Sequence, residues 1–220
     1  MSWSSGKDAA WTLHELRRSP DIDVVGLLTT VAGDEQRVTM HRVPVALLEA
    51  QARAVGMPLW KVPIPDPCPN DAYEAAMRRL LDDVRREDIR VIAFGDLFLD
   101  DVRAYRERNL SGTGVEPVFP LWKRDTTALA REMIMAGMQA VVVAVDTHVL
   151  DAACVGAPYD AAFVHALPDH ADACGERGEF HTFVWNGPMM RAPVAWEAKG
   201  SFECDHFAWC QVQAPVRQSC

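Results

Sequence analysis

The sequence predicts an α/β protein: a doubly wound, mostly parallel sheet with a smaller mixed α/β subdomain at the C-terminus. Three observations support this. Nearly half of the 220 residues, 49%, are hydrophobic, enough for a buried core. Short apolar runs alternate with helical patterns through the first two thirds of the chain, and the alternation then weakens. We therefore expect a first domain over residues 1–146 and a smaller one over residues 147–220.

Five runs are typical of buried parallel strands, because each is short, β-branched and apolar on both faces. They are residues 22–31, 58–64, 91–97, 115–121 and 140–146. Helical patterns occupy residues 7–18, 44–55, 70–87, 99–109 and 125–137. Strands of a more antiparallel region are indicated over residues 178–190, 192–196 and 207–216. The proline-rich stretch 63–70 predicts a stiff loop at the ligand-binding edge of the sheet.

The first predicted helix has matching signals at both ends. Asp8 in its first turn and Arg17 in its last complement the helix dipole, and Pro20 follows where the helix should stop. Ala9, Leu13 and Leu16 share one face, which we expect to be buried.

Charge and hydropathy exclude several function classes. The net charge is −9, from 31 acidic and 22 basic residues, which disfavours bulk binding to nucleic acid. No apolar run has the 18 or so residues that a membrane helix needs, and no signal-peptide pattern is present. We expect a cytoplasmic protein without a membrane partner. The oligomeric state stays open, a homodimer included.

The six cysteines have no C-x-x-C spacing, which argues against a disulfide framework and a zinc ribbon. Cys204, His206 and Cys210 offer three metal ligands. Their strand-like surroundings favour buried thiols instead.

A phosphate-binding turn is the main motif of the N-terminus. A Walker loop is excluded because Met1 and Asp8 stand where its first glycine and its Ser/Thr are needed. A dinucleotide-binding fingerprint is excluded because "GTGVEP", residues 112–117, lacks its last glycine. What remains is "SSGKD", residues 4–8, directly before a helix. Small residues such as Ser4, Ser5 and Gly6 let backbone amides approach an anion at the helix N-terminus.

The two charged residues of this turn have complementary roles in such a site. Lys7 supplies a full positive charge for phosphate oxygens, and Asp8 would hold a Mg²⁺ ion that bridges them. The alternative is an ordinary helix N-cap with a solvated lysine. The five residues alone leave both interpretations open.

Two motifs carry a resemblance to a known family. "SWSSGKDAAW" resembles the S-G-G-K-D-S pyrophosphate loop (PP-loop) of N-type ATP pyrophosphatases. "CGERGEFHTFVWNGPMM", residues 174–190, is similar to the signature of the diphthine–ammonia ligase family within that superfamily. Residues 40–64 and 119–146 also fit the family pattern. The resemblance implies an adenine nucleotide alpha hydrolase-like, Rossmann-like fold.

The resemblance also implies an activity. Members cleave ATP between its α and β phosphates to adenylate a carboxylate, which ammonia then converts to an amide. ATP and Mg²⁺ are the implied cofactors, and a small-molecule or protein-borne carboxylate and ammonia are the implied partners. Two rivals stay open: a nucleotide-binding sensor without turnover, and a PP-loop sulfur-transfer enzyme acting on tRNA. The acidic charge and the absence of C-x-x-C count against the second.

Three positions depart from the family pattern. Ser5 replaces a glycine, Ala9 replaces the closing serine, and Asn186 stands where an acid is frequent. Ser5 is small enough for close approach to phosphate, and we expect its φ to stay negative. The substitutions at Ser5 and Ala9 are what makes the sensor a rival.

The late motif supplies a second set of candidates. Glu176 and Glu179 are flanked by glycines, which indicates a tight loop close to a ligand. These carboxylates would bind Mg²⁺, orient an ammonium ion or accept a proton. With Gly178 in the loop and Thr182 as a donor to phosphate, the resemblance favours a functional loop over a solvated turn.

Other candidates follow from the ends of predicted strands. Thr29 and Thr30, and Gly95 and Asp96, lie where a nucleoside would sit in such a fold, with helix capping and turn formation as the alternatives. Weaker candidates are His41, Cys174 and the Trp122, Lys123 and Arg124 group. For these three, a structural histidine, a packed thiol and a solvated basic pair are favoured.

Overall fold

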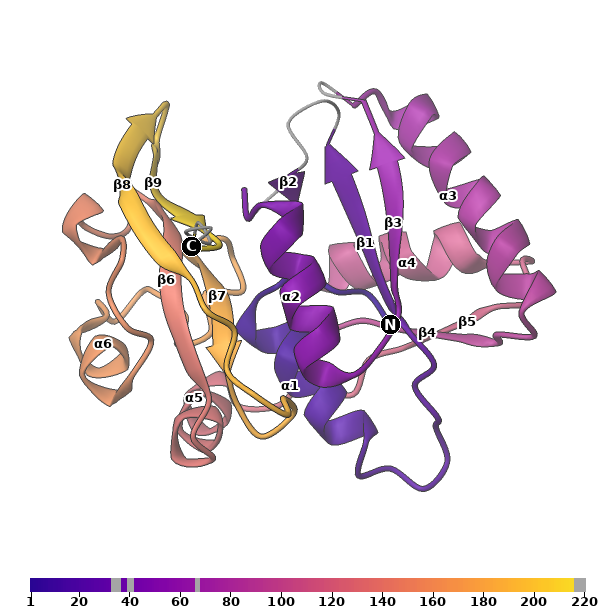
Figure 1. The fold of residues 1–220 in the computed structure, drawn as a ribbon, viewed down its shortest axis with the longest axis horizontal. Helices are drawn as coiled ribbons and strands as arrows, with labels where there is room; N and C mark the ends of the chain where they lie inside the picture. The colour runs from indigo at the N-terminus through magenta and orange to yellow at the C-terminus, as the bar shows by residue number, and fades with distance from the viewer. Residues whose placement is uncertain (33–36, 39–41, 66–67, 216–220) are drawn as a thin grey trace, which may run out of the picture.

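The computed structural model describes residues 1–32, 37–38, 42–65 and 68–215. His41 and part of the proline-rich stretch lie outside these residues. A unit with parallel strands and a separate antiparallel sheet lie side by side, with helices α1 and α2 between them (Figure 1). The structure is therefore mixed α/β.

Two short parallel ladders form the first unit. β1 (Leu27–Ala32) pairs with β3 (Leu59–Ile64) in parallel along its whole length, and with β2 (Arg37–Val38) antiparallel at its end. β4 (Val91–Ala93) pairs in parallel with β5 (Glu116–Val118). The predicted parallel pairing is confirmed here, although the strands are shorter than predicted and β2 was not predicted.

The first three residues connect these two ladders. The amide of Ser2 donates to the Ala93 carbonyl at 2.8 Å, and the amide of Trp3 donates to the Leu28 carbonyl at 2.7 Å. Ser2 forms a parallel bridge with Leu28. Residues 2 and 3, directly before the phosphate turn, therefore lie in strand-like pairing between β1 and β4.

All five predicted helices are confirmed within three residues at either end. They are α1 (Lys7–Leu16), α2 (Val45–Val55), α3 (Asn70–Arg86), α4 (Asp100–Leu110) and α5 (Thr126–Met135). A 3₁₀ turn, η1 (Ala152–Cys154), and a short helix, α6 (Ala161–Ala166), follow. Of the helices in the described part of the chain, none is both long and apolar enough to cross a membrane.

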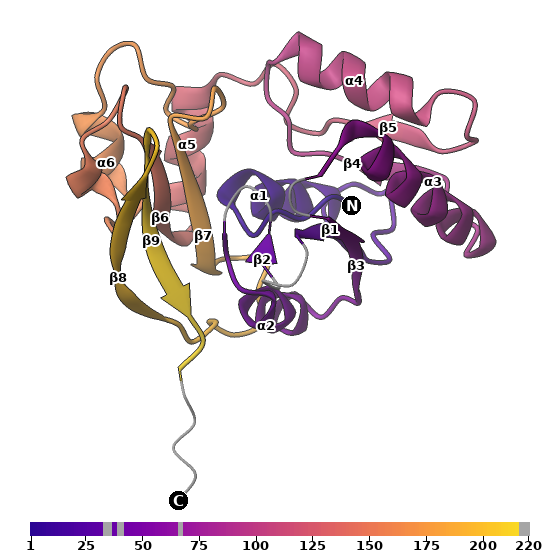
Figure 2. The same cartoon turned by 90° about the horizontal axis from the view of Figure 1, so that it is seen from above.

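The antiparallel sheet has the strand order β7-β6-β9-β8. Its strands are β6 (Gln139–Asp146), β7 (Phe180–Asn186), β8 (Glu197–Cys204) and β9 (Phe207–Gln213). The prediction of a parallel strand over 140–146 is wrong, because β6 pairs antiparallel with both β7 and β9. β6 is buried on both faces, with α5 and α6 lying on the face away from α1 (Figure 2). An apolar run of this kind does not distinguish the two directions.

Two further strand predictions at the C-terminus need correction. Residues 192–196 form no strand, and β8 begins only at Glu197. β8 was missed because it is an exposed strand at the edge of the sheet with an irregular polar sequence. Such a strand lacks the apolar alternation that identifies a half-buried one.

Helix α1 lies between the parallel-strand unit and the antiparallel sheet (Figure 2). It is therefore buried on most sides. Its buried residues are Lys7, Ala9, Ala10, Trp11, Thr12, Leu13 and Leu16. The main core cluster contains α1 residues together with residues of β1, β6 and β7, so one core joins both units. A second cluster lies beneath α3.

The turn before α1 contains a strained residue. Ser5 has a φ of 74°, in the left-handed region that favours glycine, so the expectation of a negative φ is wrong. Its side chain is fully buried, and its hydroxyl oxygen has no hydrogen-bond partner. The backbone thus keeps the conformation of a glycine turn although a serine occupies the position.

We predict that Ser5→Gly stabilises the fold. Glycine removes the cost of the positive φ and the unsatisfied hydroxyl, and this outweighs its greater freedom in the unfolded chain by about 1 kcal/mol. Urea unfolding followed by circular dichroism measures the change. Ser4→Gly is the control. Because Ser4 has no positive φ, this substitution should lower the free energy of unfolding slightly. A lower free energy of unfolding for Ser5→Gly would contradict the prediction.

Candidate functional site

A cavity of about 370 Å³ opens where the first turn, the ends of β1 and β4, helices α3 and α4 and the start of β7 meet. The sequence-predicted residues that line it are Ser4, Lys7, Asp8, Thr29, Thr30, Gly95, Asp96, Glu176 and Thr182. Residues that are 170 positions apart in the chain therefore share one cavity. Ser5, Gly6, Gly178 and Glu179 do not line it.

The N-terminus of α1 faces this cavity. Gly6 is its N-cap residue and provides no side-chain cap. The amide of Lys7 donates instead to Oγ1 of Thr182, at 3.1 Å, and the amide of Gly6 to Oγ of Ser4, at 3.4 Å. A helix N-terminus carries partial positive charge, so the arrangement suits an anion.

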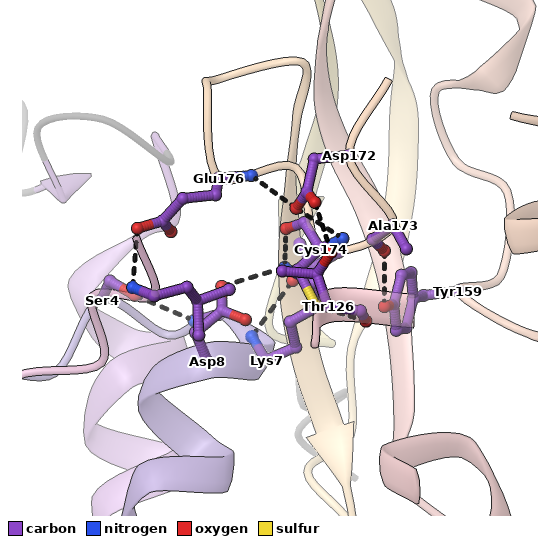
Figure 3. A network of polar contacts seen from close by, with 12 residues as sticks. Ser4, Lys7, Asp8, Thr126, Tyr159, Asp172, Ala173, Cys174 and Glu176 are labelled. Carbon is purple, nitrogen blue, oxygen red and sulfur yellow. Dashed lines mark hydrogen bonds and ion pairs between the residues drawn. The ribbon is translucent and has the colours of Figure 1, made fainter. Parts of the chain in front are cut away.

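Lys7 is almost completely buried, at 2% exposure. Its Nζ donates to Oδ2 of Asp8 at 2.9 Å and to the carbonyl of Cys174, as Figure 3 shows. The ammonium also lies 5.6 Å from the ring centroid of Tyr159 and 5.2 Å from that of Phe180. Burial is the largest single effect and lowers the pKa of Lys7, but Asp8, Cys174 and Asp172 together outweigh it, so the pKa is raised. Lys7 is charged in this site.

Asp8 has one oxygen bonded to Lys7 and one buried oxygen, Oδ1, without a hydrogen-bond partner. Burial raises the pKa of Asp8, and the neighbouring Lys7 opposes this. An unpartnered carboxylate oxygen fits a hard cation such as Mg²⁺. Within the described ranges, no group of three His, Cys, Asp or Glu side chains is arranged to hold a metal. Phosphate oxygens and water would have to complete the coordination of an ion at Asp8.

The loop over residues 172–179 is held by its own carboxylates. Asp172 accepts hydrogen bonds from the amide of Cys174 at 2.9 Å and from Oγ1 of Thr126 at 2.5 Å. Glu179 is 4% exposed, and its two oxygens accept the amides of Asp172 and Arg177, each at 2.9 Å. Glu179, predicted as catalytic, has both carboxylate oxygens hydrogen-bonded within the loop and does not line the cavity.

Gly175 and Gly178 both have positive φ, at 66° and 90°, as a tight loop requires. A Cβ on Gly175 would lie 2.7 Å from the carbonyl oxygen of Phe180, so only glycine fits there. Gly178 faces open space. It shapes the loop and does not contact the cavity.

Glu176 reaches across the cavity to the other unit. Its Oε1 accepts the amides of Leu97 at 2.7 Å and Phe98 at 3.3 Å, just beyond β4. Burial raises the pKa of Glu176 to about 7, with Asp8 and Asp96 adding to the rise and the two amides opposing it. Its pKa thus lies near neutral pH, the range in which a general acid or base is effective.

Gln51 of α2 connects the first turn to the antiparallel sheet. Its side chain is fully buried and makes three hydrogen bonds. Nε2 donates to the carbonyls of Ser5 at 3.0 Å and Val184 at 2.6 Å, and Oε1 accepts from Nε1 of Trp3 at 2.9 Å. The amide of Val184 also donates to the Ser5 carbonyl, at 3.0 Å.

The strand-end candidates all line the cavity. Thr29 is buried in β1, with Thr30 beside it, and Gly95 and Asp96 follow one residue after the end of β4. A Cβ on Gly95 would lie 3.0 Å from the carbonyl carbon of Asp8. Gly95 therefore lets the first turn of α1 pack closely, a reason that the sequence did not reveal.

The weaker candidates lie outside the cavity or are inert. Cys174 lines it, but its thiol is buried and burial raises its pKa to about 12, which argues against thiolate chemistry. Arg124 forms an ion pair with Glu132, and Lys123 is exposed. Trp122 packs against Arg103.

Sequence reasoning missed several polar residues that shape the site: Gln51, Asp172, His181, Arg106 and Tyr73. Gln51 and Asp172 do not belong to a motif that the sequence analysis recognised. His181 lies inside the late motif, directly before Thr182, and burial lowers its pKa to about 4, so it is neutral. Tyr73 and Arg106 lie on α3 and α4, at helix positions whose periodicity gave no sign that they face a cavity.

Comparisons with known proteins cover nearly the whole chain. The family model of the diphthamide synthase N-terminal domain matches residues 1–117, and that of the C-terminal domain matches residues 125–212. A diphthine–ammonia ligase of Danio rerio is 26% identical over an alignment of 220 positions, gaps included, that covers 89% of this chain and 84% of that protein.

Two mammalian relatives match over shorter lengths. The diphthine–ammonia ligase of Bos taurus is 25% identical over 67% of this chain and 61% of that protein. The one from Homo sapiens is 26% identical over 58% of this chain and 49% of that protein. The chain thus spans less than two thirds of these two relatives.

We predict that Gln51→Leu lowers the free energy of unfolding by about 3 kcal/mol. The substitution removes the Gln51 partner of two buried groups, Nε1 of Trp3 and the carbonyl of Val184, and each such group costs about 1–3 kcal/mol. The Ser5 carbonyl keeps its hydrogen bond from the Val184 amide. Urea unfolding measures the loss. The control is Gln139→Leu, because the Gln139 amide bonds Asn186 at an exposed position and should matter by less than about 0.5 kcal/mol. Equal effects of the two substitutions would contradict the prediction.

The raised pKa of Glu176 predicts a pH dependence of stability. Ionisation is harder in the folded state, where the pKa is about 7, than at the ordinary value of 4.5. The stability of the wild type relative to Glu176→Gln is therefore highest below pH 4.5 and falls as the pH rises to about 7. Urea unfolding of both proteins between pH 4.5 and 8 tests this. Glu203→Gln, at an exposed position of β8, is the control, and a constant difference between wild type and Glu176→Gln would contradict the prediction.

Proposed function

Because the chain belongs to the diphthamide synthase family, we propose that it is an ATP-dependent ligase that joins ammonia to a carboxylate in an amide bond. The family resemblance of the two sequence motifs is confirmed by these matches. The relatives are named for diphthine as the acceptor. For this chain we propose an acceptor of the same chemical class, a carboxylate on a protein or a small molecule.

One observation carries the proposal: the turn of residues 4–8 and the late glutamate motif line the same cavity. Neither would be expected to meet the other in a protein where they served only as a helix cap and an edge turn. The cavity also combines a helix N-terminus, a buried lysine and several carboxylates. In phosphoryl and adenylyl transfer, the helix N-terminus and the lysine would offset the phosphate charge, and carboxylates would hold Mg²⁺.

The first turn would hold the phosphates. The hydroxyls of Ser4 and Thr182, which accept the amides of Gly6 and Lys7, would donate to the anion at the positive end of α1, and the charged Lys7 would offset its negative charge. Asp8 would hold Mg²⁺ through its unpartnered Oδ1. Bound Mg²⁺ supplies charge neutralisation of the phosphates. Thr29, Thr30, Gly95 and Asp96 would contact the nucleoside.

Glu176 would serve the ammonia step. A carboxylate with a pKa near 7 accepts a proton from an attacking amine more effectively than an ordinary glutamate does, and returns it to solvent. Its hydrogen bonds to two backbone amides fix its position above the turn. Glu179 would act indirectly, by holding the loop that carries Glu176.

We also propose a finer description of the fold. The bonds of residues 1–3 to β1 and β4 support one doubly wound sheet with the order β3, β1, residues 1–3, β4, β5. The ATP-binding unit and a smaller C-terminal unit are retained from the sequence analysis. We place their boundary before β6 rather than at residue 146, because the strands that pair with β6, β7 and β9, belong to the antiparallel sheet. A cytoplasmic location also remains a proposal.

We predict that the protein incubated with ATP, Mg²⁺, ammonia and a carboxylate acceptor forms AMP and pyrophosphate. Lys7→Ala should lower the rate by at least about 100-fold, because it removes the positive charge beside the phosphates. Chromatographic separation of nucleotides gives the products. Lys199→Ala, which breaks an exposed ion pair with Glu197, is the matched control.

Other outcomes separate the rival functions. Release of ADP and phosphate would exclude adenylation. Binding of ATP without turnover across a broad panel of carboxylates would favour the nucleotide sensor. Unfolding midpoints of both lysine variants distinguish a catalytic effect from misfolding, because Lys7→Ala leaves Asp8 without its buried partner.

A further inference from the structure

One row of side chains crosses the antiparallel sheet from the cavity to the far edge strand. His181 of β7, which lines the cavity, is paired in register with Ala144 of β6. Ala144 is also paired with Trp209 of β9, and Trp209 with Phe202 of β8. Side chains that are paired in register point to the same face of a sheet. These four residues therefore form a continuous cross-strand row on one face.

The cross-strand row faces the parallel-strand unit. Phe180 precedes His181 in β7 and points to the opposite face, where its ring meets that of Phe163 in α6 edge-on, with the centroids 5.1 Å apart. Successive residues of a strand point to opposite faces, so His181 points away from α6. α5 and α6 lie on one side of this sheet and α1 on the other (Figure 2). The row thus lies on the side of α1, whose N-terminus faces the cavity.

Arg42 places a positive charge at the far end of the row. Its guanidinium carbon lies 5.3 Å from the ring centroid of Trp209 and 5.8 Å from that of Phe202. Arg42 is exposed and lies shortly before α2, so it belongs to the other unit. No carboxylate of the described residues forms an ion pair with it. A guanidinium that stacks on rings through its face keeps the donors in its plane available for an anion.

The spacing of the row sets the length of a ligand that would connect its two ends. Neighbouring strands lie about 4.8 Å apart, so Trp209 lies roughly 10 Å from His181, on the far side of β6, and Phe202 roughly 15 Å. Between the ends the row is apolar, with the small side chain of Ala144 followed by two half-buried rings. A ligand along the row would therefore have two polar ends and an apolar middle.

We propose that the acceptor is an elongated small-molecule dicarboxylate that binds along the cross-strand row. One carboxylate would enter the cavity beside His181, the other would bind Arg42, and the carbon chain between them would lie against Trp209. This inference rests on the proposed function, in which a carboxylate is adenylated in the cavity.

Two features of the row favour this class of acceptor. The guanidinium of Arg42 complements a carboxylate in both charge and shape. A single guanidinium above two rings also matches the size of a small molecule, whereas a stable protein interface buries about 800 Å² on each partner. The row is continuous with the cavity and, like it, is formed by both units, where small-molecule sites are frequently found.

Isothermal titration calorimetry of the protein saturated with Mg²⁺ and α,β-methylene ATP tests the proposal, because this analogue cannot be cleaved between its α and β phosphates. The matching probe is sebacate, whose extended chain separates its two carboxylates by roughly 11 Å. Succinate is too short to reach Arg42 from the cavity, and decanoate has the length of sebacate but one carboxylate. We expect the wild type to bind sebacate at least about 10-fold more tightly than either, the contribution of one charge-assisted contact.

Arg42→Gln should remove this preference. Without the charged fork, sebacate should bind within about threefold of decanoate. Arg103→Gln is the matched control, because Arg103 also stacks on two rings, those of Phe119 and Trp122, each at 4.8 Å, but lies on α4. The control should keep the wild-type preference. The ratio of the two affinities within one variant does not depend on the fraction of protein that is folded.

Three results would overturn this proposal alone. Equal affinity of the wild type for sebacate and decanoate would show that Arg42 contacts no second carboxylate. A preference for sebacate that persists in Arg42→Gln would place that carboxylate elsewhere. Absence of sebacate binding to the nucleotide-loaded wild type would indicate an acceptor of another class, such as a protein. Failure of the wild type to bind the nucleotide would overturn the proposed function as well.

Discussion

The structure depends on one junction, where the first turn of the chain is hydrogen-bonded to strand β7. The carbonyl of Ser5 accepts hydrogen bonds from the amide of Val184 and from Nε2 of Gln51. The amide of Lys7 donates to Oγ1 of Thr182. These hydrogen bonds lie in the interior. There, leaving a donor or acceptor without a partner costs more free energy than a formed hydrogen bond contributes to stability. The geometry of the phosphate turn is therefore set by a strand about 180 residues later in the chain. Without β7, the turn lacks both its cap and its support.

The loop of residues 172–179 extends the same principle to the second half of the site. The carboxylates of Asp172 and Glu179 accept hydrogen bonds from backbone amides of the loop. The carboxylate of this loop that lines the cavity is that of Glu176 (Figure 3). Lys7 is then enclosed by Asp8, the Cys174 carbonyl and two aromatic rings. A site held in this way needs little rearrangement to neutralise charge, which is how preorganised electrostatics lowers a barrier.

The sequence predicted the helices and the parallel pairs well, because periodicity and caps are local properties. It also singled out residues 4–8 and Glu176 as site residues, with the family resemblance favouring both. The direction of β6 was predicted wrongly because burial on both faces does not reveal which neighbours a strand has. Gln51 and Asp172 escaped prediction for a related reason: their importance comes from partners far away in the chain, and a single sequence holds no record of such contacts. Ser5 was misjudged because its φ is imposed by the junction and not by its own preference.

The burial of α1 between the two units has an evolutionary consequence. In many multidomain enzymes a nucleotide-binding module can be recombined with new partners, since its pocket is complete within one folding unit. Here the pocket is shared across the boundary, and the helix that carries the lysine is wrapped by both halves. Gene shuffling that replaced either half would expose the apolar flanks of α1 and leave its leading amides uncapped. The two halves must therefore evolve together, through substitutions that preserve the interface around α1.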